Sequence, residues 1–457
     1  MFATTRRAVS RALLAILFAV VLGVVAPARA ADPIKVGFSM ALTGAVAPNG
    51  KQNLLALEIW RDEVNAKGGL LGRPVELVYY DDQSNPNSVP GIYTKLIIVD
   101  KVDLLIGPYA TNMIAPAMPV IMQAGKMTIG MLGVNVNRQF NYSRYFSMVP
   151  GGDEGTLAFS RGWFEIAAAQ TPKPKTVALI AADAEFGKTA CDGARENAKA
   201  GGFEIVYDKS YPPGTTDMVP IVRAIAAANP DLVFACAYPP DTVGIVRAAN
   251  EIGLNTKMFG GAMIGLLATP IKVQLGPLMN GLVIMESFIP APTLDFPGLK
   301  AMLEKYQAKA PSLGIDPLGF GFTPFAYAAG QVLAQAVEAT KSLDHDKLAD
   351  YVHAHKFSTV AGEIAFGKDG EWTKSRQFFT QFQGVSGNDL AQFRDTAHQM
   401  ILWPPEYKTG NIIYPYQARR RSKTGWVGAK MRDADPIRRI ADEIALMLRG
   451  RASRRSR

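Results

Sequence analysis

The chain has 457 residues, of which 48% are hydrophobic, and its formal net charge is +9. That positive charge is confined to the two ends: residues 418–457 carry a net +9, residues 1–30 a net +4, and residues 31–417 a net −4. A basic chain often indicates nucleic-acid binding, but the acidic central part excludes that interpretation here, so nucleic acid is not an expected partner. The length of the central part is typical of two domains.

The first thirty residues have the pattern of a secretory signal peptide. Three arginines among the first eleven residues precede an apolar run over 12–26, and small residues then predict cleavage after Ala30. The run is shorter than the roughly twenty residues of a membrane-spanning helix. The paired arginines match a twin-arginine signal only weakly, so ordinary secretion is favoured. We therefore expect a periplasmic protein without a lipid anchor, because no cysteine follows the cleavage point.

Strand and helix patterns alternate along the acidic part of the chain. A first series is predicted over 34–40, 52–66, 75–80, 88–100, 104–107, 115–124 and 126–131. A second is predicted over 155–169, 176–182, 187–200, 204–208, 220–228, 232–236, 242–252 and 258–260. Such alternation indicates parallel sheets with crossover helices, and hence two doubly wound α/β lobes.

The later elements predict how the chain passes between the lobes. We expect lobe I to contain 31–149 and 283–358, lobe II to contain 150–282 and 359–385, and 386–417 to pack on the lobes. Long helices are predicted over 323–341 and 347–355, and a hairpin is predicted to join 363–366 to 377–383 through a turn at 367–370. Ligands of open α/β sheets bind at the carboxyl ends of the strands. Two facing lobes would therefore form a cleft that closes by a hinge motion.

The familiar motifs of enzymes are missing from the sequence. Residues 184–189 end like a phosphate-binding loop, but Ala182 stands where its first glycine is required, and no GxGxxG follows the first strand. No GxSxG motif is present. All four histidines lie between positions 345 and 398 without a metal-binding pair. We therefore expect no catalytic residues, no cofactor and no metal.

Cys191 and Cys236 are the only cysteines of the sequence. Export would permit a disulfide, and both fall in the same predicted lobe. Because Cys236 ends an apolar strand and Cys191 lies on a predicted helix, two buried free thiols are favoured over a disulfide.

Six short motifs occur in order along the chain. They are Ile34–Gly37, Leu42–Gly44, Asn65–Gly72, Tyr80–Pro86, Leu105–Pro108 and Ala184–Gly187. With these motifs in register over 33–385, the chain resembles the leucine/isoleucine/valine-type (type I) periplasmic binding proteins. The resemblance implies two Rossmann-like lobes with a three-crossing hinge. It also implies a non-catalytic, monomeric receptor that delivers a solute to the permease and ATPase of an ABC importer; a ligand-sensing receptor of the same fold is the alternative.

The resemblance also implies a set of ligand-binding residues. The hydroxyl of Thr111 would bind a carboxylate, and Leu132 and Val134 would offer backbone donors. Phe186 and Tyr238 would be the aromatic lids of the site. Ala262 stands where the family has an acidic residue that pairs with an ammonium. Tyr109, Met263 and Asn49 complete the candidates, Tyr109 as an aromatic face and Met263 as an apolar wall. From the residues themselves, the loop entering the helix at Thr111 can hold a carboxylate through backbone N–H groups and the hydroxyl. Alternatively, Thr111 only caps that helix.

The absence of an acidic residue at position 262 affects which class of solute is expected. A buried ammonium without a partner is costly, so the sequence favours an aromatic or hydrophobic carboxylate over a branched-chain amino acid or an amide. Glu185 and Asp241 remain alternative partners for an ammonium.

The basic segment 418–457 differs in composition from the rest of the chain. It is interpreted as an extension outside the fold, and adhesion to anionic lipid is the functional alternative.

Overall fold

The computed structural model describes residues 32–418. The predicted signal peptide and the basic segment after Ala418 lie outside the described residues, and the interpretations of both stay predictions. Within the described residues, no helix combines the length and apolar character needed to span a bilayer.

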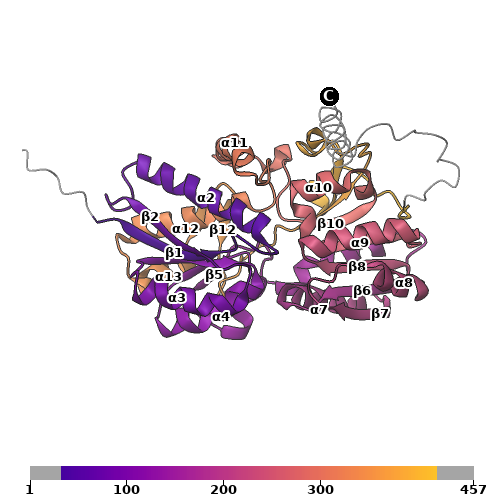
Figure 1. The fold of residues 1–457 in the computed structure, drawn as a ribbon, viewed down its shortest axis with the longest axis horizontal. Coiled ribbons are helices and arrows are strands. Elements are labelled where there is room, and N and C mark those ends of the chain that lie inside the picture. Colours follow the sequence, from indigo (N-terminus) through magenta and orange to yellow (C-terminus); the bar gives the residue numbers. More distant parts are fainter. Residues whose placement is uncertain (1–31, 419–457) are drawn as a thin grey trace, which may run out of the picture. The chain divides into compact units, whose positions relative to one another are not determined.

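The first lobe is built on a five-stranded parallel sheet in the order β2-β1-β3-β4-β5. Its strands are β1 (Ile34–Met40), β2 (Val75–Asp81), β3 (Leu104–Tyr109), β4 (Thr128–Met131) and β5 (Tyr145–Ser147). Its helices are α2 (Ala47–Ala66), α3 (Val89–Ile98), α4 (Thr111–Gln123), α5 (Asn137–Phe140), α11 (Leu299–Lys309), α12 (Thr323–Thr340) and α13 (His345–Ala354). Figure 1 shows α3 and α4 on one face of the sheet and α2 and α12 on the other. Covered on both faces, β3 is buried at every residue, as parallel strands usually are.

The contact between α2 and α12 depends on a large and a small residue. Trp60 on α2 is 1% exposed, and a Cβ atom on Gly330 of α12 would lie 2.3 Å from its ring. Glycine at this position therefore lets the indole pack directly against the backbone of the partner helix.

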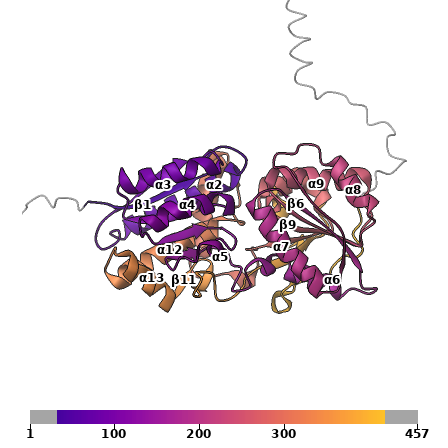
Figure 2. The same cartoon turned by 90° about the horizontal axis from the view of Figure 1, so that it is seen from below.

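The second lobe is built on a seven-stranded mixed sheet in the order β14-β13-β10-β9-β8-β6-β7. Its strands are β6 (Thr176–Ala182), β7 (Glu204–Tyr211), β8 (Leu232–Ala237), β9 (Met258–Met263), β10 (Leu282–Glu286), β13 (Phe378–Phe382) and β14 (Gln399–Trp403). Its helices are α6 (Arg161–Ala168), α7 (Glu185–Ala200), α8 (Val219–Ala227), α9 (Pro239–Ile252) and α10 (Thr269–Leu275). In Figure 2, α6 and α7 cover one face of this sheet and α8 and α9 the other. Strand β13 runs antiparallel to both of its neighbours, β10 and β14.

Two expectations about the return of the chain are wrong. The crossing expected at residue 283 comes later, because β10 continues to Glu286 as a strand of the second sheet, parallel to β9. The predicted hairpin of 363–366 with 377–383 does not form: β12 (Gly362–Ala365) pairs with β11 (Lys356–Thr359), and β13 pairs with β10 and β14. The predicted hairpin fails because β12 folds back on its immediate neighbour β11, whereas β13 finds its partner in β10, a strand distant in the sequence.

The helix predicted over 155–169 is also interrupted. A 3-10 turn spans Gly155–Phe159, and α6 begins only at Arg161. Between them Ser160 has a non-helical backbone (φ −141°), and its hydroxyl accepts a hydrogen bond from Nδ2 of Asn197 at 2.8 Å. This contact with α7 accounts for the break that the helical periodicity did not reveal.

Three crossings connect the lobes, and hydrogen bonds join them laterally. The first follows β5, the second follows β10, and the third runs from β12 to β13. The N–H of Ser147 donates to the carbonyl of Gly370 at 2.8 Å, and the indole of Trp372 donates back to the carbonyl of Ser147 at 2.9 Å. The hydroxyl of Ser287 donates to Oε1 of Gln377 at 3.2 Å. The end of β5, where the first crossing begins, and the second crossing are thus each tied to the third.

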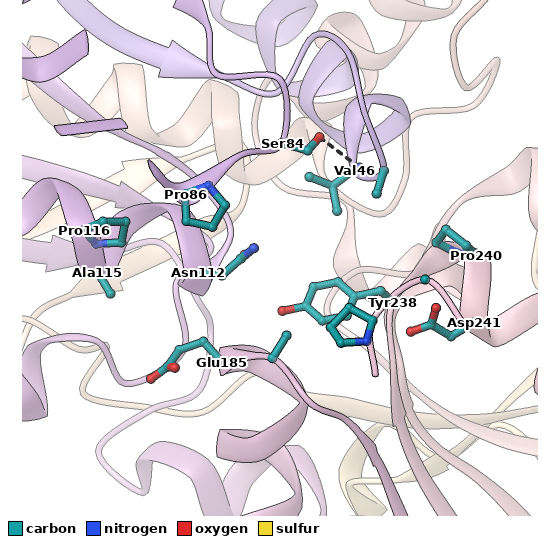
Figure 3. Close-up of a pocket in the computed structure, with 14 residues that line it drawn as sticks. Val46, Ser84, Pro86, Asn112, Ala115, Pro116, Glu185, Tyr238, Pro240 and Asp241 are labelled. Carbon is teal, nitrogen blue, oxygen red and sulfur yellow. Dashed lines mark hydrogen bonds between the residues drawn. The ribbon is translucent and has the colours of Figure 1, made fainter. Parts of the chain in front are cut away.

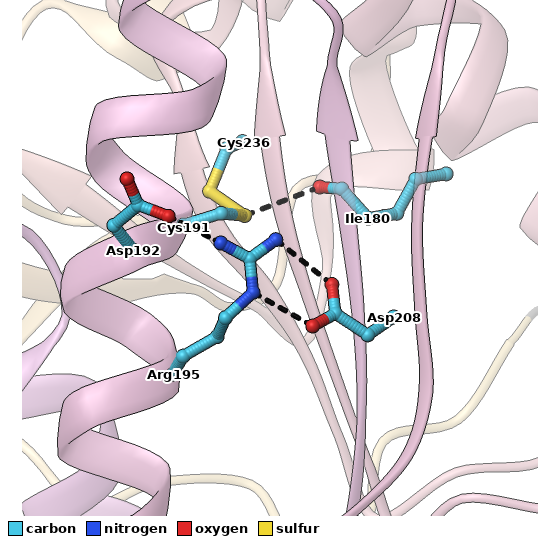
Figure 4. Close-up of polar contacts among 6 residues, drawn as sticks. All are labelled: Ile180, Cys191, Asp192, Arg195, Asp208 and Cys236. Atoms are coloured by element: carbon cyan, nitrogen blue, oxygen red, sulfur yellow. Dashed lines mark hydrogen bonds and ion pairs between the residues drawn. A yellow bond between two sulfur atoms is a disulfide. The ribbon is translucent and has the colours of Figure 1, made fainter.

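The prediction of two free thiols is contradicted by the structure. Cys191 and Cys236 form a disulfide with a Cα–Cα distance of 6.1 Å, within the usual range. Both residues are completely buried, since Cys191 lies on the face of α7 that packs over β8 (Figure 4). Nearby, Arg195 pairs with Asp208 through two contacts of 2.7 and 2.9 Å and also contacts Asp192. The helix is therefore attached to the sheet by the covalent bond and by this charge pair.

A buried carboxyl on the third crossing makes stability depend on pH. Burial raises the pKa of Glu371 from the ordinary 4.5 to about 8, and the charge of Asp369 adds to this, whereas the hydroxyl of Ser147 acts in the opposite direction. The unfolded chain then binds fewer protons than the folded one between about pH 4.5 and 8. Stability contributed by this group is complete below that window and is lost as the pH rises through it, at up to about 1.4 kcal/mol per pH unit.

We therefore expect Glu371→Gln to flatten the fall in unfolding free energy between pH 5 and 8, as measured by urea denaturation at several pH values. Glu304→Gln, at an exposed position of α11, serves as the control and should keep the wild-type slope. Equal slopes for all three proteins would show that Glu371 does not titrate in this range.

Candidate functional site

A small inner chamber lies where strand ends of both lobes meet the crossings. Its volume is about 50 Å³. Six of the nine predicted site residues line it, namely Tyr109, Thr111, Leu132, Val134, Phe186 and Tyr238. The two lobes thus contribute to one site at the carboxyl ends of their strands, as expected for open α/β sheets.

Thr111 joins two loops of the first lobe. It is the first residue of α4, follows Ala110 in a left-handed conformation (φ 81°), and is 3% exposed. Its Oγ1 accepts a hydrogen bond from the N–H of Val134 at 3.0 Å. The hydroxyl therefore does not cap its own helix, contrary to the alternative interpretation, and its hydrogen remains to be donated. A carboxylate oxygen in the chamber is a suitable acceptor for it.

Tyr109 is held from behind by Asn49. The Nδ2 of Asn49 donates to the Tyr109 hydroxyl at 2.8 Å, and the Tyr109 ring packs edge-on against Phe322 with centroids 5.6 Å apart. Burial raises the pKa of Tyr109 well above its usual range, so its hydroxyl stays neutral. Asn49 does not line the chamber itself and acts as a positioning residue.

The second lobe presents an aromatic wall. The Tyr238 hydroxyl accepts a hydrogen bond from the N–H of Phe186 at 3.3 Å, and the two rings meet edge-on at 5.7 Å. Phe159 also packs edge-on against Phe186, with ring centroids 6.3 Å apart. These contacts hold the lids at the starts of α7 and α9 in one arrangement.

The predicted roles of Ala262 and Met263 are not supported by the geometry. Both are buried in β9, and neither is among the residues that line the chamber; Ile264 and Leu267, just after the strand, form the apolar wall instead. The predicted positions are one or two residues before Ile264, because the turn after β9 lines the chamber and the strand itself does not. Among the described residues, no Asp or Glu lines this chamber.

A second, larger cavity of about 560 Å³, the outer cavity, is drawn in Figure 3. Among the described residues, Tyr238 alone lines both spaces, and Figure 3 shows its ring projecting between Asn112 and Asp241. Glu185 and Asp241, the alternative partners for an ammonium, line this outer cavity and not the inner chamber. Glu185 also lines a separate cavity of about 280 Å³ that Thr111 and Val134 border. Asp241 accepts a hydrogen bond from the Tyr211 hydroxyl at 3.1 Å, and burial raises the pKa of Asp241.

The inner chamber is narrow compared with the outer cavity, at about 50 Å³ against about 560 Å³. Separation of the lobes or a movement of Tyr238 would enlarge it for a solute. The three crossings supply the hinge that the first movement requires.

Sequence reasoning missed the contribution of the crossings. Val149 and Pro150 from the first, Met285 and Ser287 from around the second, and Gln377 from the third all line the inner chamber. Their residue types give no local signal, because only the path of the chain between the lobes brings them together.

Two α/β lobes, a three-crossing hinge and a shared chamber define a two-lobed solute-binding protein. The sequence matches the model of the family described as "Periplasmic binding protein" over residues 33–386. The chain belongs to this family, whose members are solute-binding proteins and not enzymes.

Individual relatives are distant in sequence but cover most of the chain. The leucine-, isoleucine-, valine-, threonine- and alanine-binding protein of Pseudomonas aeruginosa is 23% identical over 345 residues, covering 75% of this chain and 88% of the relative. A branched-chain amino acid transporter substrate-binding protein of Streptococcus pneumoniae, solved with isoleucine, has a TM-score of 0.67 at 20% identity and covers 82% of this chain and 100% of that one. A solute-binding protein of Rhodopseudomonas palustris HaA2, solved with p-hydroxybenzoic acid, has a TM-score of 0.67 at 22% identity and covers 82% and 98%.

Proposed function

We propose that this protein is the periplasmic solute-binding component of an ABC importer and that it binds a small aromatic or hydrophobic carboxylate by closure of the two lobes. The main support for this proposal is the composition of the inner chamber. Thr111 offers it a hydrogen-bond donor for a carboxylate, and among the described residues no acidic side chain lines it to pair with an ammonium. The aromatic side chains of Tyr109, Phe186 and Tyr238 favour an apolar body. Proteins of similar structure have been solved with isoleucine and with p-hydroxybenzoic acid, so an amino acid and an aromatic carboxylate are both reasonable candidates for the solute.

The bound solute would be released to an inner-membrane permease driven by its ATPase. Closure supplies the signal, because binding energy gained between the lobes shifts the population toward the closed form. The receptor would act as a monomer, since the site is complete within one chain.

Pairs of solutes that differ only in the α-amino group test the carboxylate assignment. We expect isocaproate to bind more tightly than leucine, and phenylpropionate more tightly than phenylalanine, because an ammonium in the inner chamber would have no acidic partner there. Thermal shift of the mature chain measures this: a solute at one hundred times its dissociation constant stabilises by about 2.7 kcal/mol. Stabilisation by leucine and phenylalanine with no response to the desamino acids would overturn the assignment.

A further inference from the structure

Gln377 is a buried polar residue on the hinge side of the inner chamber. It ends the third crossing, directly before β13, and is 1% exposed. Its side chain lines the chamber together with Ser287 of the second crossing. This amide takes part neither in the carboxylate contact at Thr111 nor in the aromatic wall.

The hydrogen bonding of this amide is incomplete. Its Oε1 accepts from the Ser287 hydroxyl at 3.2 Å, whereas its buried Nε2 has no hydrogen-bond partner within residues 32–418. An amide nitrogen carries two donors, and a buried donor without an acceptor is unfavourable. Ser287 fixes one end of the amide, so the other end offers a defined donor.

The position of this donor distinguishes it from that of Thr111. Thr111 stands at the start of α4 in the first lobe, whereas Gln377 and Ser287 belong to crossings, as do Val149 and Pro150 of the same chamber. The chamber therefore has a hydroxyl donor, Thr111, on the first lobe and an amide donor, Gln377, at the hinge. A solute that satisfies both presents at least two acceptor oxygens, one toward each donor.

We propose that Gln377 is a solute-binding residue that donates through Nε2 to a second oxygen of the solute, which makes the preferred solute a hydroxy- or oxo-substituted carboxylate. This proposal rests on the carboxylate receptor proposed above and specifies its substrate class. Contact with Gln377 also engages the hinge directly, because Ser287 ties the amide to another crossing.

The test compares matched solutes on matched variants. The probes are phenylpropionate with para-hydroxyphenylpropionate, benzoate with para-hydroxybenzoate, and isocaproate with its oxo analogue ketoisocaproate. Gln377→Met keeps the approximate size and shape of the side chain and removes the donor. Thr380→Val is the control: Thr380 is buried in β13, accepts from Nε2 of Gln399 at 3.0 Å and does not line the chamber. Calorimetric titration gives the affinity ratio within each pair.

In the wild type and in Thr380→Val, the oxygen-bearing member of at least one pair should bind about tenfold more tightly. In Gln377→Met that ratio should fall toward one, with the affinity for the plain acid retained. The proposal is overturned if the ratio survives in Gln377→Met, if no pair shows a preference in the wild type, or if Gln377→Met weakens both members equally.

These outcomes separate the two proposals. Tight binding of plain carboxylates without any preference leaves the carboxylate receptor standing and removes the role of Gln377. Binding of neutral solutes alone removes the carboxylate receptor, and the role of Gln377 is then decided by the same ratio for neutral solutes with and without a carbonyl oxygen.

Discussion

Thr111→Val is expected to weaken binding of a carboxylate solute by about 10- to 100-fold, the range that corresponds to losing one hydrogen bond to a charged group. Valine keeps the branched shape but removes the only hydroxyl at the start of α4 that lines the inner chamber. The same change removes the acceptor of the Val134 N–H, so a loss of stability of about 1 kcal/mol should accompany it. Titration of the mature protein with the solute measures the first effect, and urea denaturation the second.

Thr111→Ser is the matched control, because it restores the hydroxyl and loses only a methyl group. It should recover most of the affinity and keep the acceptor for Val134. If the serine variant binds as weakly as the valine variant, the methyl group and not the hydroxyl carries the effect. Equal affinity of all three proteins would exclude Thr111 from the site.

Replacing both Cys191 and Cys236 by alanine is expected to lower the free energy of unfolding by about 4 kcal/mol. The bond joins residues 45 positions apart, and closing a loop of that length in the unfolded chain accounts for roughly this amount. Both side chains are fully buried, so the loss of two sulfur atoms adds a packing cost. Denaturant unfolding followed by tryptophan fluorescence measures the difference.

A reductant distinguishes the loss of the covalent bond from the loss of packing. Added during denaturant unfolding, it should destabilise the wild type markedly and leave the double alanine variant unchanged. Two reactive thiols in the unreduced wild type, titrated after denaturation, would contradict the disulfide.

Local patterns in the sequence were sufficient for many single elements. The strand predicted over 34–40 matches β1, and the helix predicted over 323–341 differs from α12 by one residue at its end. Hydrophobic periodicity and helix-ending residues act over a few neighbours, so they can be recognised without the fold. The motifs shared with the leucine/isoleucine/valine-type receptors also led to Thr111, Phe186 and Tyr238, which the structure brings to one chamber.

By itself, then, the sequence determined the family, the two α/β lobes and six residues that line the inner chamber. Only the tertiary structure decided the pairing of Cys191 with Cys236, the place of β10 in the second sheet and the hydrogen bond from Val134 to Thr111. It also brought Ser287 and Gln377 together across 90 positions of the chain. The physical reason is common to all four: each depends on which distant segments lie side by side, and no local propensity carries that information.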